Sequence, residues 1–478
     1  MGRVKRIKKK NLKYKIIWSI SFLVYVVFLV YLFILDMLPT KYLLIGIIPT
    51  ALIYFITMIF MFNMKVKKKI KITSSVFLII FMLVFGVGIK YMYSTVGFLD
   101  AIDNKLFQRA TYYVMVLEKS KYNKLSDLKN KKMGIYSSDN SKAALKKVEK
   151  KVDVDDTSYT DVEKMINDLQ NKKIESILIN DSAKSLIDSE LELDIKLKCI
   201  GKVSIPIEKE DIVKKVDITK KKFNIFVAGG DAYGSIKNVT NTDVNMIISV
   251  DPVNNKVLLT SIPRDYYVNL TSFGTNAYDK LTHAGYYGIE ESVKTVEKLL
   301  DVDINYYVKV NFSTVEGVIN AIGGVDVDSD YTFCVTTTGV CVRKGMNHLN
   351  GYQAMMFARE RESFRDGDVQ RVKNQQKVIS AVIDKATGST KIITNFTSIL
   401  DSVKESMSTN MDRKSINKFV KKQLDSMKGW DIESQNLTGI NSSSTNTYSM
   451  PGMNLYVMEQ DPESVKSAKD KIKQFMGE

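Results

Sequence analysis

Three long apolar runs near the N-terminus constrain this chain of 478 residues more than any other feature. They cover residues 16–35, 42–64 and 76–89. The first two have about the 20 residues that a bilayer-spanning helix needs, and the third reaches that length with its flanking residues. A buried helical hairpin in a soluble protein is the alternative, but hydrophobic stretches of this length favour three transmembrane helices within residues 1–95.

Basic residues beside these runs predict their orientation. Residues 3–15 and 65–71 are rich in lysine and arginine and contain no acidic residue. The positive-inside rule then places the N-terminus and the second connection in the cytoplasm, and everything after about residue 93 outside. Residues 1–100 hold 15 basic and 2 acidic residues, against 54 and 51 in the rest. Most of the net charge of +16 therefore belongs to the membrane segment, and nucleic acid is not an expected partner.

A second feature is a set of three β-branched, apolar runs at 224–228, 245–250 and 256–262. A turn-forming segment, 251–255, joins the last two runs and predicts an antiparallel hairpin. If the first two runs are also antiparallel, the chain runs up, down and up. One edge of the sheet then collects residues 229–231, 242–243 and 263–265.

This edge brings together Asp231, Asp243 and Arg264. Hard carboxylate oxygens suit Mg²⁺ or Mn²⁺, and a forked guanidinium suits the phosphate oxygens that such an ion holds. The pattern therefore predicts a metal and phosphate site. For either aspartate alone, an ordinary loop residue beside glycine and asparagine is the alternative.

Residues 357–376 contain four of the chain's 10 arginines, although the chain has 59 lysines. Arginine in place of lysine indicates planar, bidentate recognition of phosphate or carboxylate. Arg359 and Arg361 alternate as in a strand, which predicts that both face one side. Asp368 and Arg371 are spaced to share one face of a following helix. Because acidic residues are interleaved, a solvated run of ion pairs is the alternative.

Between these regions, residues 105–213 alternate strand and helix patterns, which predicts a small α/β domain. Its order resembles half of a periplasmic solute-binding fold, but it shows no ligand constellation, so we expect an accessory or spacer domain. Residues 205–222 are predicted to be a linker. Residues 220–478 then form a larger α/β domain, an α-β-α sandwich with a mixed central sheet and helices on both faces.

Several local predictions follow from spacing and composition. Residues 289–300 and 314–321 have helical periodicity, and 306–311 are typical of a strand. Residues 278–287 and 441–446 are predicted to be loops. Cys334 and Cys341 flank a predicted hairpin tip. The two cysteines either form a disulfide in an oxidising compartment or remain free thiols, and the sequence leaves both alternatives open. Cys199 is predicted to be a small buried residue.

Seven motifs occur in one order over about 150 residues. They are Gly229-Gly230-Asp231 after a strand; Thr242-Asp243 before one; 261–265 (SIPRD); 280–284 (KLTHA); 321–325 (AIGGV); 357–361 (FARER); and Asp368 to Arg371 followed by Gln375-Gln376. Together they resemble the LytR-CpsA-Psr family, and within it the capsule-type CpsA branch. The resemblance is strong over residues 222–387. One departure is Asn241, because many members have arginine before this Ser-Asp or Thr-Asp pair.

The resemblance implies a membrane-anchored, multi-pass phosphotransferase with its C-terminal domains outside the cell. Its donor would be a glycopolymer, of capsule or teichoic-acid type, on polyprenyl pyrophosphate. Its acceptor would be a peptidoglycan hydroxyl, and membrane lipid would be a further partner. By motif, Asp231 and Asp243 would hold Mg²⁺ or Mn²⁺. The pyrophosphate would contact Arg264, Arg359, Arg361, Arg371 and Gln375, with Lys280 and Asp368 supporting the site.

Two other function classes stay open at this point. A non-catalytic protein that binds lipid-linked glycan and regulates polymer length or export would explain the arginines, but not the two metal-type aspartates beside them. A DNA-binding attenuator would fit the basic composition, and it requires the arginine-rich segment to lie inside the cell. The apolar faces of 293–300, 315–322 and 378–383 could line a trough for a lipid tail, although core packing explains them equally well.

Overall fold

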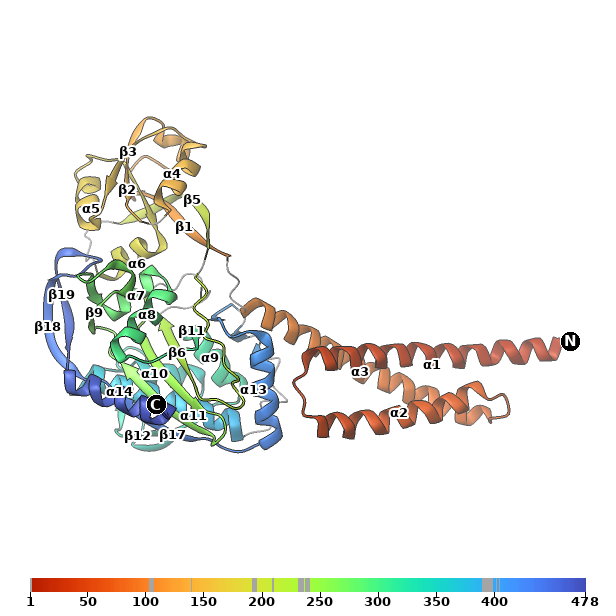
Figure 1. The fold of residues 1–478 in the computed structure, drawn as a ribbon. Helices are drawn as coiled ribbons and strands as arrows, with labels where there is room; N and C mark the ends of the chain where they lie inside the picture. The colour runs from red at the N-terminus through yellow and green to blue at the C-terminus, as the bar shows by residue number, and fades with distance from the viewer. Residues whose placement is uncertain are drawn as a thin grey trace.

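The structure is a computed structural model that describes residues 2–102, 107–138, 140–190, 196–208, 210–230, 236, 241–388, 399–400, 402–403 and 405–478. Its chain forms three consecutive parts (Figure 1). We name them the helical region (2–102), the accessory region (107–208) and the C-terminal region (210–478). The accessory and C-terminal regions lie against each other, and the helical region extends away from them.

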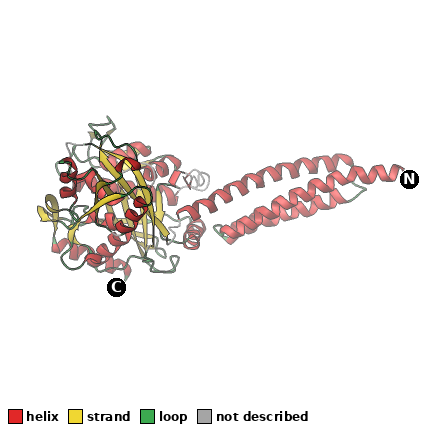
Figure 2. Ribbon diagram, turned by 90° about the horizontal axis from the view of Figure 1, so that it is seen from above, coloured by secondary structure: helices red, strands yellow, loops and turns green. Residues whose placement is uncertain are grey.

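The helical region consists of α1 (Gly2–Leu35), α2 (Thr40–Phe62) and α3 (Lys68–Ile102). Within the described residues, these three helices are long and apolar enough to cross a membrane, with mean hydropathies of 2.4 to 2.5. Most of their apolar side chains face outward, whereas polar groups pair inside the bundle, as Ser21 does with Tyr54 at 2.8 Å. The three predicted membrane helices are therefore confirmed as elements, and Figure 2 shows them as one extended bundle.

The connection between α1 and α2 lies against α13 (Arg413–Ser426) of the C-terminal region. Lys421 forms an ion pair with Asp36 at 2.6 Å, and Asn417 donates a hydrogen bond to the Leu35 carbonyl at 2.5 Å. The N-terminus and the connection between α2 and α3 lie at the opposite end of the bundle (Figure 1). The first connection and the C-terminal region are therefore on one side of any membrane that the helices cross.

The accessory region is a five-stranded sheet in the order β3-β2-β4-β1-β5. Its elements are β1 (Phe107–Leu117), β2 (Lys131–Tyr136), α4 (Ser141–Glu149), β3 (Val154–Tyr159), α5 (Val162–Gln170), β4 (Ser176–Asn180), α6 (Asp181–Glu190) and β5 (Leu197–Glu208). Leu178 lies in a cluster with Val148 of α4, and its neighbour Ile177 lies in another with Met165 of α5. Because neighbouring residues of a strand face opposite ways, the sheet is covered on both faces, as predicted for an α/β unit.

The accessory region packs directly on the C-terminal region. Tyr286, Met450 and Leu455 of the C-terminal region join the cluster formed by α5, α6 and β4, and Ser182 donates a hydrogen bond to the Tyr286 carbonyl. The predicted linker, 205–222, is wrong in its bounds. It begins inside β5, and Ile218 is buried against Phe223 because apolar residues in this stretch find a core to join.

The C-terminal region contains a mixed six-stranded sheet in the order β16-β11-β6-β7-β8-β17. Its strands are β6 (Phe223–Gly230), β7 (Val244–Asp251), β8 (Lys256–Ile262), β11 (Tyr306–Asn311), β16 (Met407–Thr409) and β17 (Asp431–Asn436). β7 pairs antiparallel with both β6 and β8, so the chain runs up, down and up as predicted. β11 and β17 add to the two sides in parallel.

Helices cover both faces of this sheet, so the predicted sandwich is confirmed. Phe226 and Ile247 point toward α8 (Ile289–Leu300) and α14 (Pro462–Met476). Val227 and Met246, one position along each strand, point instead to the face of α11 (Asp368–Gly388). The residues predicted to form one lipid trough therefore divide between two faces, because α8 and α11 lie on opposite sides of the sheet.

Shorter elements complete the C-terminal region. They are β9 (Tyr267–Asn269), β10 (Tyr278–Lys280), α7 (Leu281–Ala284), α9 (Phe312–Ala321), β12 (Val325–Ser329), β13 (Phe333–Cys334), β14 (Cys341–Val342), β15 (Gly345–Leu349), α10 (Gly351–Arg359), β18 (Gly439–Asn446) and β19 (Pro451–Gln460). Two predicted loops are wrong. Residues 278–287 form β10 and α7, which bury Asp279 and Leu281, and 441–446 belong to β18, which pairs with β19.

The cysteine predictions have different outcomes. Cys334 and Cys341 are directly opposite each other in the β13–β14 hairpin and form a disulfide. Cys199 is a free thiol and is exposed, so its predicted burial is wrong. Cys199 lies on β5, which is an outer strand of the accessory sheet, and an outer strand is covered less than a central one.

Candidate active site

The site begins where three strands of the C-terminal sheet end or start. Gly229 pairs with Val244, and Asn245 pairs with Ile262, so β6 ends beside the start of β7 and the end of β8. Asp243 directly precedes β7 and Arg264 lies two residues after the end of β8, so both lie at the same edge. The convergence of these two side chains follows from the strand register alone.

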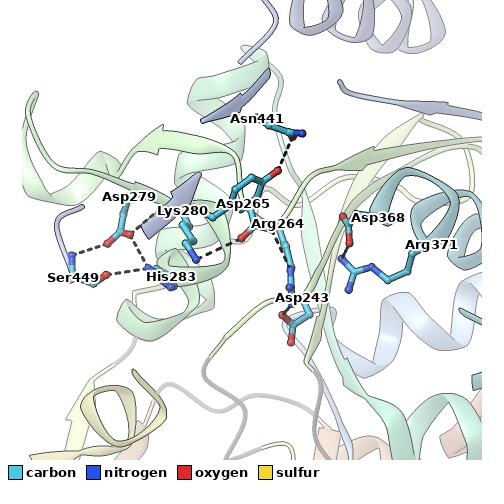
Figure 3. A network of polar contacts seen from close by, with 11 residues as sticks. Asp243, Arg264, Asp265, Asp279, Lys280, His283, Asp368, Arg371, Asn441 and Ser449 are labelled. Atoms are coloured by element: carbon cyan, nitrogen blue, oxygen red, sulfur yellow. Dashed lines mark hydrogen bonds and ion pairs between the residues drawn. The ribbon is translucent and has the colours of Figure 1, made fainter. Parts of the chain in front are cut away.

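Asp243 and Arg264 form an ion pair, with 2.8 Å between Oδ1 and Nη1 (Figure 3). Asn241 donates a hydrogen bond to the other carboxylate oxygen of Asp243 at 2.9 Å. Asp265 accepts a longer hydrogen bond from Arg264 Nε, at 3.4 Å. Burial alone would lower the pKa of Arg264, but Asp265 and Asp243 raise it above its ordinary value. Arg264 is therefore a permanent cation held in one orientation.

A second guanidinium lies on the first turns of α11. Arg371 is 9% exposed and pairs with Asp368 at 2.5 Å. Burial lowers the pKa of Arg371, and the nearby guanidiniums of Arg264 and Arg361 act in the same direction. Its Nε atom is buried and has no hydrogen-bond partner among the described residues. A buried, unsatisfied donor on a cation is energetically unfavourable, and an anionic ligand would satisfy it.

Two buried hydroxyl groups also lack partners beside these charges. Thr242 and Thr282 are 1% and 6% exposed, and within the part of the chain that the structure describes neither Oγ1 atom has a hydrogen-bond partner. Backbone hydrogen bonds connect their segments, because Thr282 N donates to the Arg264 carbonyl at 2.8 Å and Thr242 N donates to the Thr282 carbonyl at 3.3 Å. Unsatisfied donors on three adjoining segments indicate a place that a polar ligand completes.

Lys280 stands on the other side of Asp265, with 3.7 Å between Nζ and Oδ1. A buried network fixes the segment that carries it (Figure 3). Asp279 contacts His283 Nδ1 at 2.7 Å and accepts backbone hydrogen bonds from Lys280 at 2.8 Å and Ser449 at 2.7 Å. Ser449 Oγ also contacts His283 Nδ1, at 3.0 Å. Because Asp279 and His283 are fully buried, this network ties residue 449 to the lysine.

The predicted strand through Arg359 and Arg361 is wrong. Asn350 caps α10 by accepting a hydrogen bond from Gln353 N at 2.9 Å, and the helix continues to Arg359. The Arg359 guanidinium lies over the Phe312 ring, 4.3 Å from its centroid. Arg361 follows the helix in an exposed turn, within electrostatic reach of Arg371. Apolar packing of the α10 face overrides the alternating charge pattern.

The other predicted residues are placed as follows. Gln375 is half-buried on α11, one turn after Arg371, whereas Gln376 is buried and donates to Ser261 Oγ at 2.9 Å. Asp231 lies outside the described residues. The predicted roles of all these residues stay predictions.

The site must also supply ligands if it holds a metal ion. Among the described residues, no group of three or more His, Cys, Asp or Glu is arranged to hold a metal ion. The two carboxylate oxygens of Asp243 accept hydrogen bonds from Asn241 and Arg264. Carboxylate oxygens are the ligands that a hard cation prefers, so the chemistry of Asp243 fits such an ion.

Sequence reasoning assigned no role to Asp265, which lies in the 261–265 motif, and none to Asp279, which directly precedes the 280–284 motif. Their positions in and beside these motifs were the signal. Ser449, Asn441 and Tyr456 had no local signal, because they reach the site through the β18–β19 hairpin, whose first strand was predicted to be a loop.

Two protein-family models match different parts of this chain. The family model described as the LytR_cpsA_psr family matches residues 198–471, more than half of the chain. The chain belongs to the LytR-CpsA-Psr family. A second family model, described as NMT1/THI5 like, matches residues 104–193 in the accessory region.

Relatives of this LytR-CpsA-Psr protein are named as transferases. A protein of Bacillus mycoides (strain KBAB4), named polyisoprenyl-teichoic acid–peptidoglycan teichoic acid transferase TagU, is 34% identical over 219 residues, which cover 45% of this chain and 70% of the relative. TagT of Bacillus subtilis (strain 168), similarly named, is 32% identical and covers 42% and 64%. The matched segment thus spans about two thirds of these relatives.

Solved structures match over a similar range. B. subtilis TagV is 27% identical with a TM-score of 0.45, covering 54% of this chain and 99% of TagV. A TagT structure described with bound octaprenyl pyrophosphate lipid is 25% identical with a TM-score of 0.42, covering 56% and 95%.

Proposed function

We propose that this chain is a membrane-anchored phosphotransferase that moves a glycopolymer from polyprenyl pyrophosphate to a peptidoglycan hydroxyl. The observation that carries the proposal is the pair of Arg264, which is partly buried, and Arg371, which is buried and whose Nε has no hydrogen-bond partner among the described residues. The two guanidiniums lie within electrostatic reach of each other, and a pyrophosphate would supply the anion that they attract. The names of the TagU and TagT relatives support the same donor and acceptor.

The proposed roles of the site residues depend on how deeply each one lies. Arg264 and Arg371 would bind the two phosphoryl groups from the floor of the site, because both are partly or fully buried and held by carboxylates. Arg359 and Arg361, which are exposed, would close on the donor from the rim. Lys280 and Asp368 would keep these groups oriented, and Gln375 would add a neutral donor on α11. Stabilising charge in this way is the main requirement of phosphoryl transfer.

We propose Mg²⁺ or Mn²⁺ as the cofactor, held by Asp243 together with Asp231. When bound, such an ion would polarise the phosphoryl oxygens and lower the repulsion of an incoming nucleophile. Asp243 would share its carboxylate between the ion and Arg264, and Asn241 would orient that carboxylate in place of the arginine that many family members have there.

The reaction balances without a covalent enzyme intermediate. The acceptor hydroxyl oxygen forms a bond to the sugar-linked phosphorus, and the bond from that phosphorus to the bridging oxygen breaks. Polyprenyl phosphate leaves with the bridging oxygen, the hydroxyl proton is released, and the polymer is joined to the wall by a phosphodiester. The glycopolymer would be of capsule or teichoic-acid type.

The prenyl chain needs an apolar surface near the phosphates. The α11 face of the sheet provides half-buried side chains for it, including Val227, Ile248, Ile379, Ile383 and Trp430. Fully buried residues on the opposite face, such as Val293, are already packed in the core. We therefore propose that the lipid lies on the α11 face.

We also propose that the accessory and C-terminal regions are outside the cell. Basic residues flank the far end of the helical bundle, and the connection between α1 and α2 contacts α13. The Cys334–Cys341 disulfide agrees with an oxidising compartment. Cys199 is an exposed thiol and serves as the probe. An impermeant maleimide should label intact cells, Cys199→Ser should abolish the labelling, and labelling only after lysis would contradict this orientation.

A reconstituted assay tests the activity. Purified full-length chain is given synthetic polyprenyl-pyrophosphate glycan, soluble wall fragments and Mg²⁺, and polymer-linked fragments are measured by mass spectrometry. Asp243→Ala and Asp231→Ala should each abolish product while the chain still folds. Donor binding by the wild type without any product would instead support a non-catalytic glycan-binding protein.

A further inference from the structure

The β18–β19 hairpin has two faces of different character. Cross-strand partners share a face, and Ser444 and Ser442 pair with Leu455 and Val457, which are 5% and 0% exposed. This inner face packs on the accessory region through Leu455. The next positions along each strand point the other way.

The second face, which we name the open face, contains Asn441, Ser443, Asn454, Tyr456 and Met458. Ser443 pairs with Tyr456, and Asn441 pairs with Met458, which is half-buried against the core. The other four residues are exposed, Tyr456 by 46%. None of them carries a charge, and the whole of β18 (GINSSSTN) lacks charged residues in a chain where 26% of residues are charged. The open face thus offers amides, hydroxyl groups and one aromatic ring.

The open face adjoins the cationic site. Met458 N donates a hydrogen bond to the Asp265 carbonyl at 2.7 Å, which fixes β19 beside the residue that follows Arg264. Tyr456 lies within electrostatic reach of Asp265, Asp368 and Arg264. In the view of Figure 3, Asn441 lies on one side of Arg264, and Asp368 and Arg371 lie on another. A ligand on the open face would therefore reach the reaction centre from a direction different from that of Arg371 on α11.

The Tyr456 side chain is fixed in position on the open face. Its hydroxyl donates a hydrogen bond to Asn441 Oδ1 at 2.7 Å, which fixes the ring on the open face. Burial raises the pKa of Tyr456, and the carboxylates of Asp265 and Asp368 raise it further. The phenol therefore stays protonated, and its ring provides an apolar surface with a polar end.

We propose that the open face is the subsite for the acceptor, where a neutral sugar ring of peptidoglycan packs on Tyr456 and hydrogen-bonds to Asn441 and Ser443. The proposal rests on the transferase function above. A sugar ring has an apolar C–H face and a rim of hydroxyl groups, which match an aromatic ring beside uncharged amides. The arginines and the α11 face serve the donor, so the uncharged side is left for the acceptor, whose hydroxyl must approach the phosphorus opposite the leaving group.

The test separates acceptor binding from donor chemistry. In the reconstituted assay, Tyr456→Ala should raise the KM for soluble wall fragments about 10-fold, the amount that corresponds to ~1.4 kcal/mol. Donor affinity and slow hydrolysis of the donor by water should not change. Tyr352→Ala, an exposed tyrosine on α10, is the matched control and should leave every value unchanged. Tyr456→Phe keeps the ring and should show a smaller rise.

Direct binding keeps the proposal distinguishable from the proposed function. Soluble wall fragments are titrated into the full-length chain, and Tyr456→Ala should weaken binding by a similar factor. If the wild type binds fragments through Tyr456 yet transfers no polymer, the subsite stands and the transferase function fails. If Tyr456→Ala binds and transfers normally, if wild type binds no fragment, or if the variant loses donor hydrolysis to the same extent, the subsite is overturned.

Discussion

The accessory region and the C-terminal region are both α/β sheets covered by helices, yet they place charge differently. In the described part of the accessory region, the buried polar residues are two serines, Ser141 and Ser176. Its carboxylates pair near the surface, as Asp168 does with Lys173 at 2.8 Å. The buried polar atoms without a hydrogen-bond partner in this part are the hydroxyl oxygens of Ser120 and Ser176, which are neutral, so no buried charge there is left for a ligand to satisfy.

The C-terminal region buries whole ionic groups. Asp279, Lys280 and Arg371 are less than 10% exposed, and Arg371 Nε remains without a partner. Burying charge is unfavourable unless it is paired, so incomplete pairing at one edge of a sheet indicates a binding site rather than a stabilising feature. Both regions belong to the same fold class, but the position of their charges makes the C-terminal region a candidate enzyme and the accessory region a candidate spacer.

The largest effect should come from the partly buried guanidinium of Arg264 in the C-terminal site. Arg264→Lys keeps the charge but loses the planar fork, so we expect the transfer rate to fall by about 100-fold or more. Arg343→Lys, at an exposed position, is the control and should leave the rate unchanged. If Arg264→Lys transfers polymer at nearly the wild-type rate, the charges of the C-terminal region would not form a binding site, and the two regions would not differ in this respect.

The two histidines of the chain isolate the effect of burial. His283 and His348 each contact a carboxylate at 2.7 Å, but His283 is fully buried and the His348 side chain is 59% exposed. His283→Ala should lower the free energy of unfolding by about 2–4 kcal/mol, because it leaves Asp279 buried without one of its partners. His348→Ala should change it by less than about 1 kcal/mol. Urea unfolding of the detergent-solubilised chain measures both, and equal effects would contradict the argument.

Acid stability should depend on Asp251, which closes the β7–β8 turn. Burial would raise the pKa of Asp251, but hydrogen bonds from Asn254 and Val253 lower it below its ordinary value. A depressed pKa gives stability that is present above the unfolded value of about 3.9 and is lost as the pH falls through the folded value. Asp251→Asn should therefore lower the unfolding midpoint at pH 7 and flatten its decline in acid. A midpoint that falls as steeply in the variant as in the wild type would show that Asp251 is not responsible.

The smallest effect should come from the accessory region. Lys173 lowers the pKa of Asp168, but this pair is in contact with solvent, which screens it. Asp168→Asn should shift the thermal midpoint less than Asp251→Asn does and leave transfer unchanged. A loss of transfer would mean that charge in the accessory region acts on the site after all, and differential scanning fluorimetry with the reconstituted assay would detect it.

Local sequence alone determined much of this protein. The three membrane helices, the strands β6 to β8 and the meeting of Asp243 with Arg264 follow from hydrophobic length, β-propensity and turn residues, because each depends on neighbours in the chain. The packing of α10 was not predictable in this way. Its apolar face, including Phe357, decided that Arg359 ends a helix, although the alternating charges suggested a strand.

Only the tertiary structure decided which distant residues complete the site. Ser449 reaches Asp279 across 170 positions, and Asn441 and Tyr456 reach the surroundings of Arg264 because β19 attaches to Asp265. The hydrophobic pattern of residues 439–460 does not predict that this hairpin reaches the site. A polar strand such as β18 is stabilised by its pairing with β19 and by the region on which it packs. Propensity and spacing act between near neighbours, whereas a site is made by contacts that exist only after the chain has folded.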